Sequence, residues 1–85
     1  MAHSIEFKPC VDRELDLLPR EVRAHIVKAV MALADTPRPV GCKKLKGRDA
    51  WRIRVGNYRV IYEIHDNILV VLVVRVARRR EAYKA

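Results

Sequence analysis

An alternating segment followed by a two-residue turn constrains the fold most strongly. Residues 51–55 have the sequence Trp-Arg-Ile-Arg-Val, in which apolar and basic side chains alternate at every position. Because successive side chains of a strand point to opposite faces of a sheet, this pattern predicts a strand with one apolar and one basic face. Gly56-Asn57 is a two-residue hairpin connection of the Gly-X kind, so residues 58–64 are expected to return as the antiparallel partner strand.

The loop length fixes the register of this hairpin. The predicted cross-strand pairs are Val55–Tyr58, Arg54–Arg59, Ile53–Val60 and Arg52–Ile61. The face expected to pack on helices consists of Trp51, Ile53, Val55, Tyr58, Val60 and Tyr62. The opposite face carries Arg52, Arg54 and Arg59, and we call it the arginine face. Packing is therefore the expected role of Trp51, Tyr58 and Tyr62.

The predicted arginine face opposes two like charges directly. A cross-strand pair such as Arg54 and Arg59 destabilises a sheet by roughly a few tenths to one kcal/mol. One interpretation is a row of solvated arginines on an open face. The other, which we favour, is a phosphate site, because an anion removes the repulsion and guanidinium groups match phosphate oxygens.

The remaining segments predict an α+β domain. Residues 3–8 predict a short first strand, residues 12–18 a short helix, and Pro19 fits the first position of a second helix. The apolar stripe of that second helix consists of Val22, Ile26, Ala29 and Leu33, with Val30 beside it, and residues 35–39 end it.

After a turn at residues 65–67, the apolar and β-branched residues 68–76 predict a strand covered on both faces. The expected order is a short strand, a two-helix hairpin and a three-stranded antiparallel meander. Residues 1–85 would thus form one domain with the helices on one sheet face.

The excess positive charge lies entirely in the second half of the chain. Residues 1–42 contain six Lys/Arg and six Asp/Glu, whereas residues 43–85 contain twelve and four. This asymmetry indicates a polyanionic partner such as a nucleic acid. The basic connection over residues 40–50 carries the candidate RNA-backbone contacts Lys43, Lys44, Lys46 and Arg48, although a merely solvated loop is the alternative.

Other sequence features argue against a membrane span, a signal peptide, a disulfide framework, a metal site and catalysis by histidine. No apolar run reaches the roughly 18–20 residues of a membrane span, and residues 1–10 lack a signal-peptide stretch, so a cytosolic protein is expected. Cys10 and Cys42 provide neither a disulfide framework nor a four-ligand metal site. The three histidines lie far apart without a catalytic pattern.

Two segments resemble the RelE/ParE superfamily of toxins from toxin–antitoxin systems. Residues 45–62, Leu-Lys-Gly-Arg-Asp-Ala-Trp-Arg-Ile-Arg-Val-Gly-Asn-Tyr-Arg-Val-Ile-Tyr, resemble its alternating basic strand and the Gly-x-Tyr-Arg-x-x-Tyr motif that follows. Residues 78–83, Arg-Arg-Arg-Glu-Ala-Tyr, resemble its closing pattern of His, Arg, Lys, Glu, an aliphatic residue and Tyr. The helical hairpin and its proline-rich exit also match, so the resemblance covers nearly the whole chain.

The resemblance implies a function. RelE-type members cut messenger RNA in the ribosomal A site by attack of the ribose 2′-OH on the adjacent phosphate, with no metal or other cofactor. Carried over by position, the catalytic residues are Arg52, Arg54, Arg59, Arg79 and Tyr83. The basic residues Arg78 and Arg80 join the RNA-binding set. The implied partners are a cognate antitoxin, the ribosome and messenger RNA.

Within that set, the chemistry suggests separate roles. Arg54, Arg59 and Arg79 are expected to stabilise the charge on the phosphorus oxygens, and Arg79 also to assist the leaving oxygen. Tyr83 is the candidate that orients or deprotonates the 2′-OH, because neighbouring cations favour its anion. The sequence departs from the family where Arg52 and Arg54 stand in place of lysines and Arg78 in place of His.

Two alternatives remain open at this point. A ParE-like inhibitor of DNA gyrase would use the same fold, but such relatives generally lack the combination of basic residues and tyrosine. A non-catalytic RNA-binding module would explain the basic half, but it gives no reason for Tyr83 near Arg79.

Overall fold

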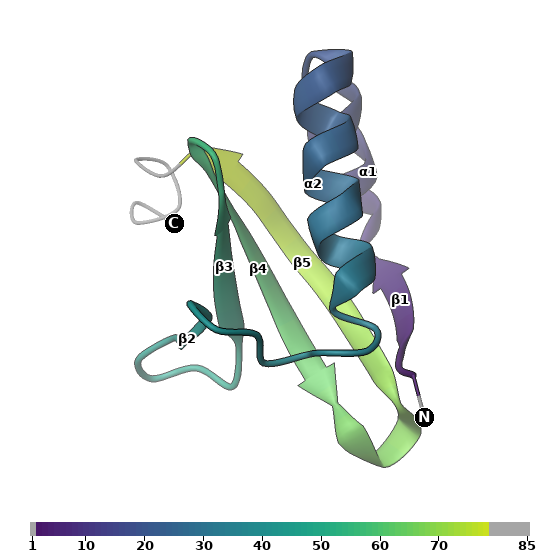
Figure 1. Ribbon diagram of the computed structural model, residues 1–85, viewed down its shortest axis with the longest axis vertical. Helices are drawn as coiled ribbons and strands as arrows, with labels where there is room; N and C mark the ends of the chain where they lie inside the picture. The colour runs from purple at the N-terminus through teal and green to yellow at the C-terminus, as the bar shows by residue number, and fades with distance from the viewer. Residues whose placement is uncertain (1, 79–85) are drawn as a thin grey trace.

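The protein, described over residues 2–78 by a computed structural model, is a mixed sheet covered by two helices on one face (Figure 1). The elements are β1 (Ser4–Phe7), α1 (Pro9–Asp16), α2 (Arg20–Ala32), β2 (Lys43–Lys44), β3 (Trp51–Val55), β4 (Tyr58–His65), the 3-10 helix η1 (Asp66–Ile68) and β5 (Val70–Arg78). The strand order is β1-β5-β4-β3-β2. β1 runs parallel to β5, and the other neighbours are antiparallel.

The predicted hairpin is confirmed in every detail of its register. β3 begins and ends where the alternation does, and the pairs run from Val55↔Tyr58 through Arg54↔Arg59 to Trp51↔Tyr62. Gly56 has a φ of 58° at the turn, and glycine adopts this left-handed conformation with little strain because it has no Cβ. The α+β class and the placement of both helices on one face are also confirmed.

Several predicted boundaries were wrong for local reasons. α1 begins at Pro9 instead of residue 12. Proline has no backbone N–H, but the first position of a helix does not need one, so Pro9 can start the helix. α2 begins at Arg20, since Pro19 has an extended ψ of 146° and serves as the N-cap. β5 begins at Val70 because η1 and Leu69, with a φ of 53°, come first.

The sheet also holds two arrangements that the sequence did not predict. The basic connection contains the two-residue edge strand β2, which pairs with β3. The first strand, β1, lies beside the last, β5, and not beside the hairpin. The expected meander is therefore the centre of a larger sheet.

The core lies between the helices and the apolar face of the sheet. Its buried residues are Val11, Leu15, Ile26, Val30, Leu33, Ile53, Val60, Tyr62, Val71, Val73 and Val76. Trp51, Tyr58 and Val22 are half-buried and pack against this cluster, as predicted. The longest helix, α2, has 13 residues, and no helix within residues 2–78 is long and apolar enough to cross a membrane.

Candidate nucleic-acid interface

The three predicted strand arginines share the sheet face that lies away from the helices. Arg54 and Arg59 are direct cross-strand partners, and Arg52 pairs with Ile61. Their chain neighbours Ile53 and Val60 belong to the helix-side core. Because side chains alternate along a strand, the arginines must point the opposite way. The structure thus brings together Arg52, Arg54 and Arg59 as the register predicted.

Burial separates these arginines into two kinds. Arg54 is exposed, whereas Arg52 retains 6% and Arg59 4% of its accessible surface. The interpretation of three solvated arginines is therefore wrong for two of them. Arg59 also lies in β4 between Arg54 of β3 and Ala77 of β5, and Ala77 is itself buried. A guanidinium removed from bulk water acts on a nearby anion through a lower effective dielectric constant.

One lysine of the basic connection joins the arginine face. Lys43 of β2 is the cross-strand partner of Arg52, so the two side chains share a face, whereas Lys44 pairs with Trp51 on the other. A shallow pocket of about 350 Å³ lies at this edge, lined by Val40, Gly41, Lys43, Arg52, Ile53 and Arg54. The structure therefore adds Lys43 to the arginines and leaves Lys44 aside.

Lys46 and Arg48 lie in the exposed loop between β2 and β3. The loop closes on itself through the Leu45 N–H, which donates to the Ala50 carbonyl at 2.8 Å. These two cations extend the positive surface beyond the sheet.

The C-terminal members of the predicted site are only partly described. Arg78, the last residue of β5, lies opposite Tyr58, whose side chain packs on the helix side. Arg78 also lines a pocket of about 350 Å³ with Leu17 and Leu18. By this register Arg78 does not share the arginine face, and its part in RNA binding stays a prediction. Arg79, Arg80 and Tyr83 lie outside the described residues.

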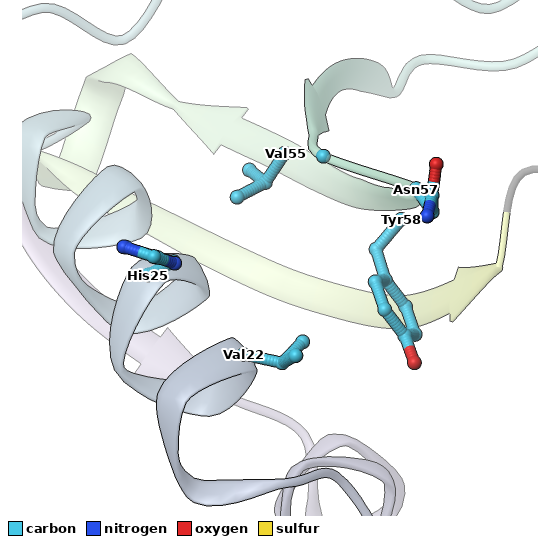
Figure 2. Close-up of a pocket in the computed structure, with 6 residues that line it drawn as sticks. Val22, His25, Val55, Asn57 and Tyr58 are labelled. Carbon is cyan, nitrogen blue, oxygen red and sulfur yellow. The ribbon is translucent and has the colours of Figure 1, made fainter.

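A third pocket lies on the helix side of the hairpin tip. Val22 and His25 of α2 face Val55, Asn57 and Tyr58 across about 270 Å³ (Figure 2). Because Val55 and Tyr58 belong to the apolar face of the hairpin, this pocket is separated from the arginines by the sheet. His25 is therefore remote from the arginine face.

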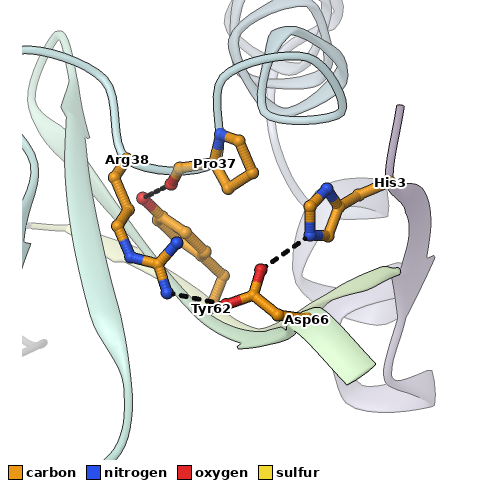
Figure 3. Close-up of polar contacts among 5 residues, drawn as sticks. All are labelled: His3, Pro37, Arg38, Tyr62 and Asp66. Carbon is orange, nitrogen blue, oxygen red and sulfur yellow. Dashed lines mark hydrogen bonds and ion pairs between the residues drawn. The ribbon is translucent and has the colours of Figure 1, made fainter. Parts of the chain in front are cut away.

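A polar network fixes the segment that leads from α2 to β2 (Figure 3). Asp66 accepts a hydrogen bond from His3 Nε2 and another from Arg38, both at 3.0 Å. The Arg38 guanidinium also lies 5.2 Å from the ring centroid of Trp51. These contacts, from His3 first and Arg38 second, hold the pKa of Asp66 below its usual value. The network ties the residue before β1, the segment after α2 and η1 together at one end of the sheet.

Tyr62 supports the same segment from inside the core. Its side chain is fully buried, and its hydroxyl donates to the Pro37 carbonyl at 2.7 Å. Burial raises the pKa of Tyr62 far above its ordinary value, so the phenol stays protonated and remains a donor. The sequence placed Tyr62 on the core face but gave no signal for this partner.

Comparison with known proteins relates this geometry to a family. Residues 5–83 match the family described as the ParE toxin of type II toxin–antitoxin system, parDE. Toxin RelG of Mycobacterium tuberculosis is 31% identical over 87 residues, which cover 99% of each chain. The mRNA interferase toxin RelE of Escherichia coli K12 is 28% identical over 85 residues, which cover 96% of this chain and 88% of that one.

Solved structures agree with the sequence comparisons. In the toxin–antitoxin complex RelBE2 of Mycobacterium tuberculosis, one chain superposes with a TM-score of 0.83 at 27% identity. The match covers 93% of this chain and 100% of that one. Since the family match spans nearly all residues and the fold agrees, this chain belongs to the RelE/ParE superfamily of toxins from type II toxin–antitoxin systems.

Proposed function

We propose that this chain is a toxin that cleaves messenger RNA on the ribosome and is neutralised by a cognate antitoxin. The observation that carries the proposal is the pairing of exposed Arg54 with buried Arg59, joined by Arg52 and Lys43 on one sheet face. Like charges at a cross-strand pair repel each other, and such an arrangement suits a phosphate group. Relatives named mRNA interferase RelE support an RNA phosphate as the ligand.

The proposed reaction is attack of a ribose 2′-OH on the adjacent phosphorus, with loss of the 5′ oxygen. Arg54, at the surface, would meet the phosphate first. Arg59, held in the sheet, would stabilise the negative charge that grows on the phosphorus oxygens without moving to do so. Arg79 would assist the leaving oxygen, and Tyr83 would orient or deprotonate the 2′-OH. The products are a cyclic phosphate and a free 5′-OH, and the ribosome would supply alignment of the substrate.

The proposal that a cognate antitoxin neutralises this chain rests on similar proteins. The structural neighbours include RelB–RelE complexes from Mycobacterium tuberculosis and Pyrococcus horikoshii. A basic protein with exposed apolar side chains, among them Leu17 and Val40, offers surface for an antitoxin with acidic and apolar segments.

Mapping of new RNA 5′ ends after incubation with translating ribosomes tests the activity. Wild type should produce new ends within codons in the A site. Arg54→Gln, Arg79→Ala and Tyr83→Phe should each reduce their yield, by about 10²–10³ for a lost transition-state donor. Lys28→Gln on the exposed side of α2 is the charge-matched control and should cleave like wild type.

The same experiment separates the alternatives. Growth arrest with DNA damage and intact messenger RNA would replace the proposal with gyrase inhibition. Salt-dependent RNA binding without new 5′ ends would leave only a binding module.

A further inference from the structure

One irregularity in β5 decides which of its side chains share a face with the arginines. β4 and β5 pair Tyr62 with Val73 but Ile61 with Arg75, so Val74 is an extra residue, a β-bulge. As a result Val73 and Val76, three positions apart, are both buried in the helix-side core. In an uninterrupted strand two residues at that spacing would point to opposite faces.

The bulge determines which side chains of β5 point to the arginine face beside the catalytic candidates; we call this the phase of β5. Beyond it, Ala77 is the cross-strand partner of Arg59, and it is 6% exposed. Without the extra residue, Val76 would take that position and would leave the core. The arginine face would then receive a larger side chain next to Arg59.

A carboxylate of α1 contacts the two residues that follow the bulge. Glu14 Oε1 accepts a hydrogen bond from the Val76 N–H at 2.9 Å, and Glu14 Oε2 lies 3.7 Å from Arg75 Nε. At the bulged residue itself, Cys10 Sγ donates to the Val74 carbonyl at 3.7 Å. The pairing of β1 with β5 ends at Phe7↔Val73, so among residues 2–78 no strand covers this part of the edge. A hydrogen bond from a backbone N–H to a carboxylate is stronger than one to a neutral acceptor.

We infer that Glu14 is a positioning residue for RNA cleavage, because it fixes the β5 bulge and so the alignment of Ala77 with Arg59. The inference rests on the proposed function for its activity readout. It assigns no chemistry to Glu14, whose carboxylate is bound to Val76 and Arg75 on the edge of β5. The effect on the reaction passes through the phase of the strand.

Three variants separate the hydrogen bond from the charge. Glu14→Gln keeps an acceptor oxygen for the Val76 N–H and removes the charge opposite Arg75. Glu14→Ala removes both contacts. If the alanine variant does not fold, Glu14→Asp takes its place, because the aspartate side chain is one methylene shorter and its carboxylate lies farther from the Val76 N–H. Glu21→Ala, which removes an exposed carboxylate in the first turn of α2, is the matched control.

Cleavage and RNA affinity are measured together. Glu14→Ala should lower the single-turnover cleavage rate at saturating toxin about tenfold or more, since a 1 Å misplacement can cost on the order of a hundredfold. Its affinity for an RNA with a 2′-deoxy cleavage position should stay within about twofold, because the phosphate-binding side chains are untouched. Glu14→Gln should retain most of the rate.

The phase itself is read by NMR, independently of cleavage. Wild type should show the contact between Arg59 and Ala77 and slow exchange of the Val76 amide. Glu14→Ala should lose both, and Glu14→Gln should keep both. If wild type cleaves no RNA, the proposed function fails while these signals still decide the role of Glu14 in the phase of β5. An unchanged rate and an unchanged Arg59–Ala77 contact in Glu14→Ala would overturn the inference, as would equal losses in the Gln and Ala variants.

Discussion

Replacing Arg54 by Gln should stabilise the empty protein at low salt. Arg54 and Arg59 are direct cross-strand partners, and like charges in that relation cost about 0.2–1 kcal/mol. For a domain of this size each kcal/mol moves the melting temperature by about 4–8 °C, so the expected rise is about 1–8 °C. Because Arg54 is exposed, the difference should shrink at 1 M salt, where the Debye length is about 3 Å.

Thermal melts of both proteins in low salt, high salt and added phosphate provide the assay. Phosphate at about a hundred times its dissociation constant adds roughly 2.7 kcal/mol to a protein with an intact site. Arg54→Gln should lose much of that increment, whereas Lys28→Gln should keep it. The reasoning is refuted if Arg54→Gln melts below wild type without anion and responds to phosphate as strongly as wild type does.

Three further predictions test other parts of the structure. Asp66→Asn should lower the free energy of unfolding at neutral pH, because the pKa of Asp66 is lowered in the folded state. This stabilisation is complete above the unfolded-state pKa of about 4 and is lost as the pH falls through the folded-state pKa, so the variant and wild type should converge at low pH. A difference in urea melts that stays constant with pH would contradict this. Ile26→Ala should cost about 2–5 kcal/mol in denaturant melts, since Ile26 is 1% exposed, and a loss as small as that of exposed Met31→Ala would contradict the core assignment. Lys43→Gln should weaken RNA binding and reduce its salt slope by about one phosphate contact, while Lys44→Gln should have the smaller effect.

The hairpin could be predicted because its information is local. Strict alternation fixed the faces of β3, and a two-residue turn fixed its register with β4, so the pairing of Arg54 with Arg59 followed from counting. The same local pattern placed Ile53 and Val60 in the core.

The remaining features depend on contacts between distant segments. β2 has two residues, too few to show a period, and its place depends on pairing with β3. The parallel pairing of β1 with β5 joins the two ends of the described chain. The low exposure of Arg59 could not be predicted either, because alternation tells only which face a side chain occupies and not how much of it other residues cover. The bulge of β5 depends on Glu14, 62 residues away from Val76.

The Tyr62 hydroxyl connects the core to the basic connection, and its removal should affect both. Tyr62→Phe leaves the Pro37 carbonyl without its donor, at a cost of about 1–3 kcal/mol if water does not replace it. Pro37 lies in the segment between α2 and β2, where the Cys42 N–H donates to the Pro39 carbonyl at 3.0 Å. That amide should exchange faster in Tyr62→Phe, and RNA affinity should fall because Lys43 is the next residue. Tyr58→Phe is the control, because the Tyr58 hydroxyl forms no hydrogen bond within residues 2–78. Equal exchange rates for Cys42 in wild type and Tyr62→Phe would show that the segment is held without Tyr62, for example by the contacts of Arg38 with Asp66 and Trp51 alone.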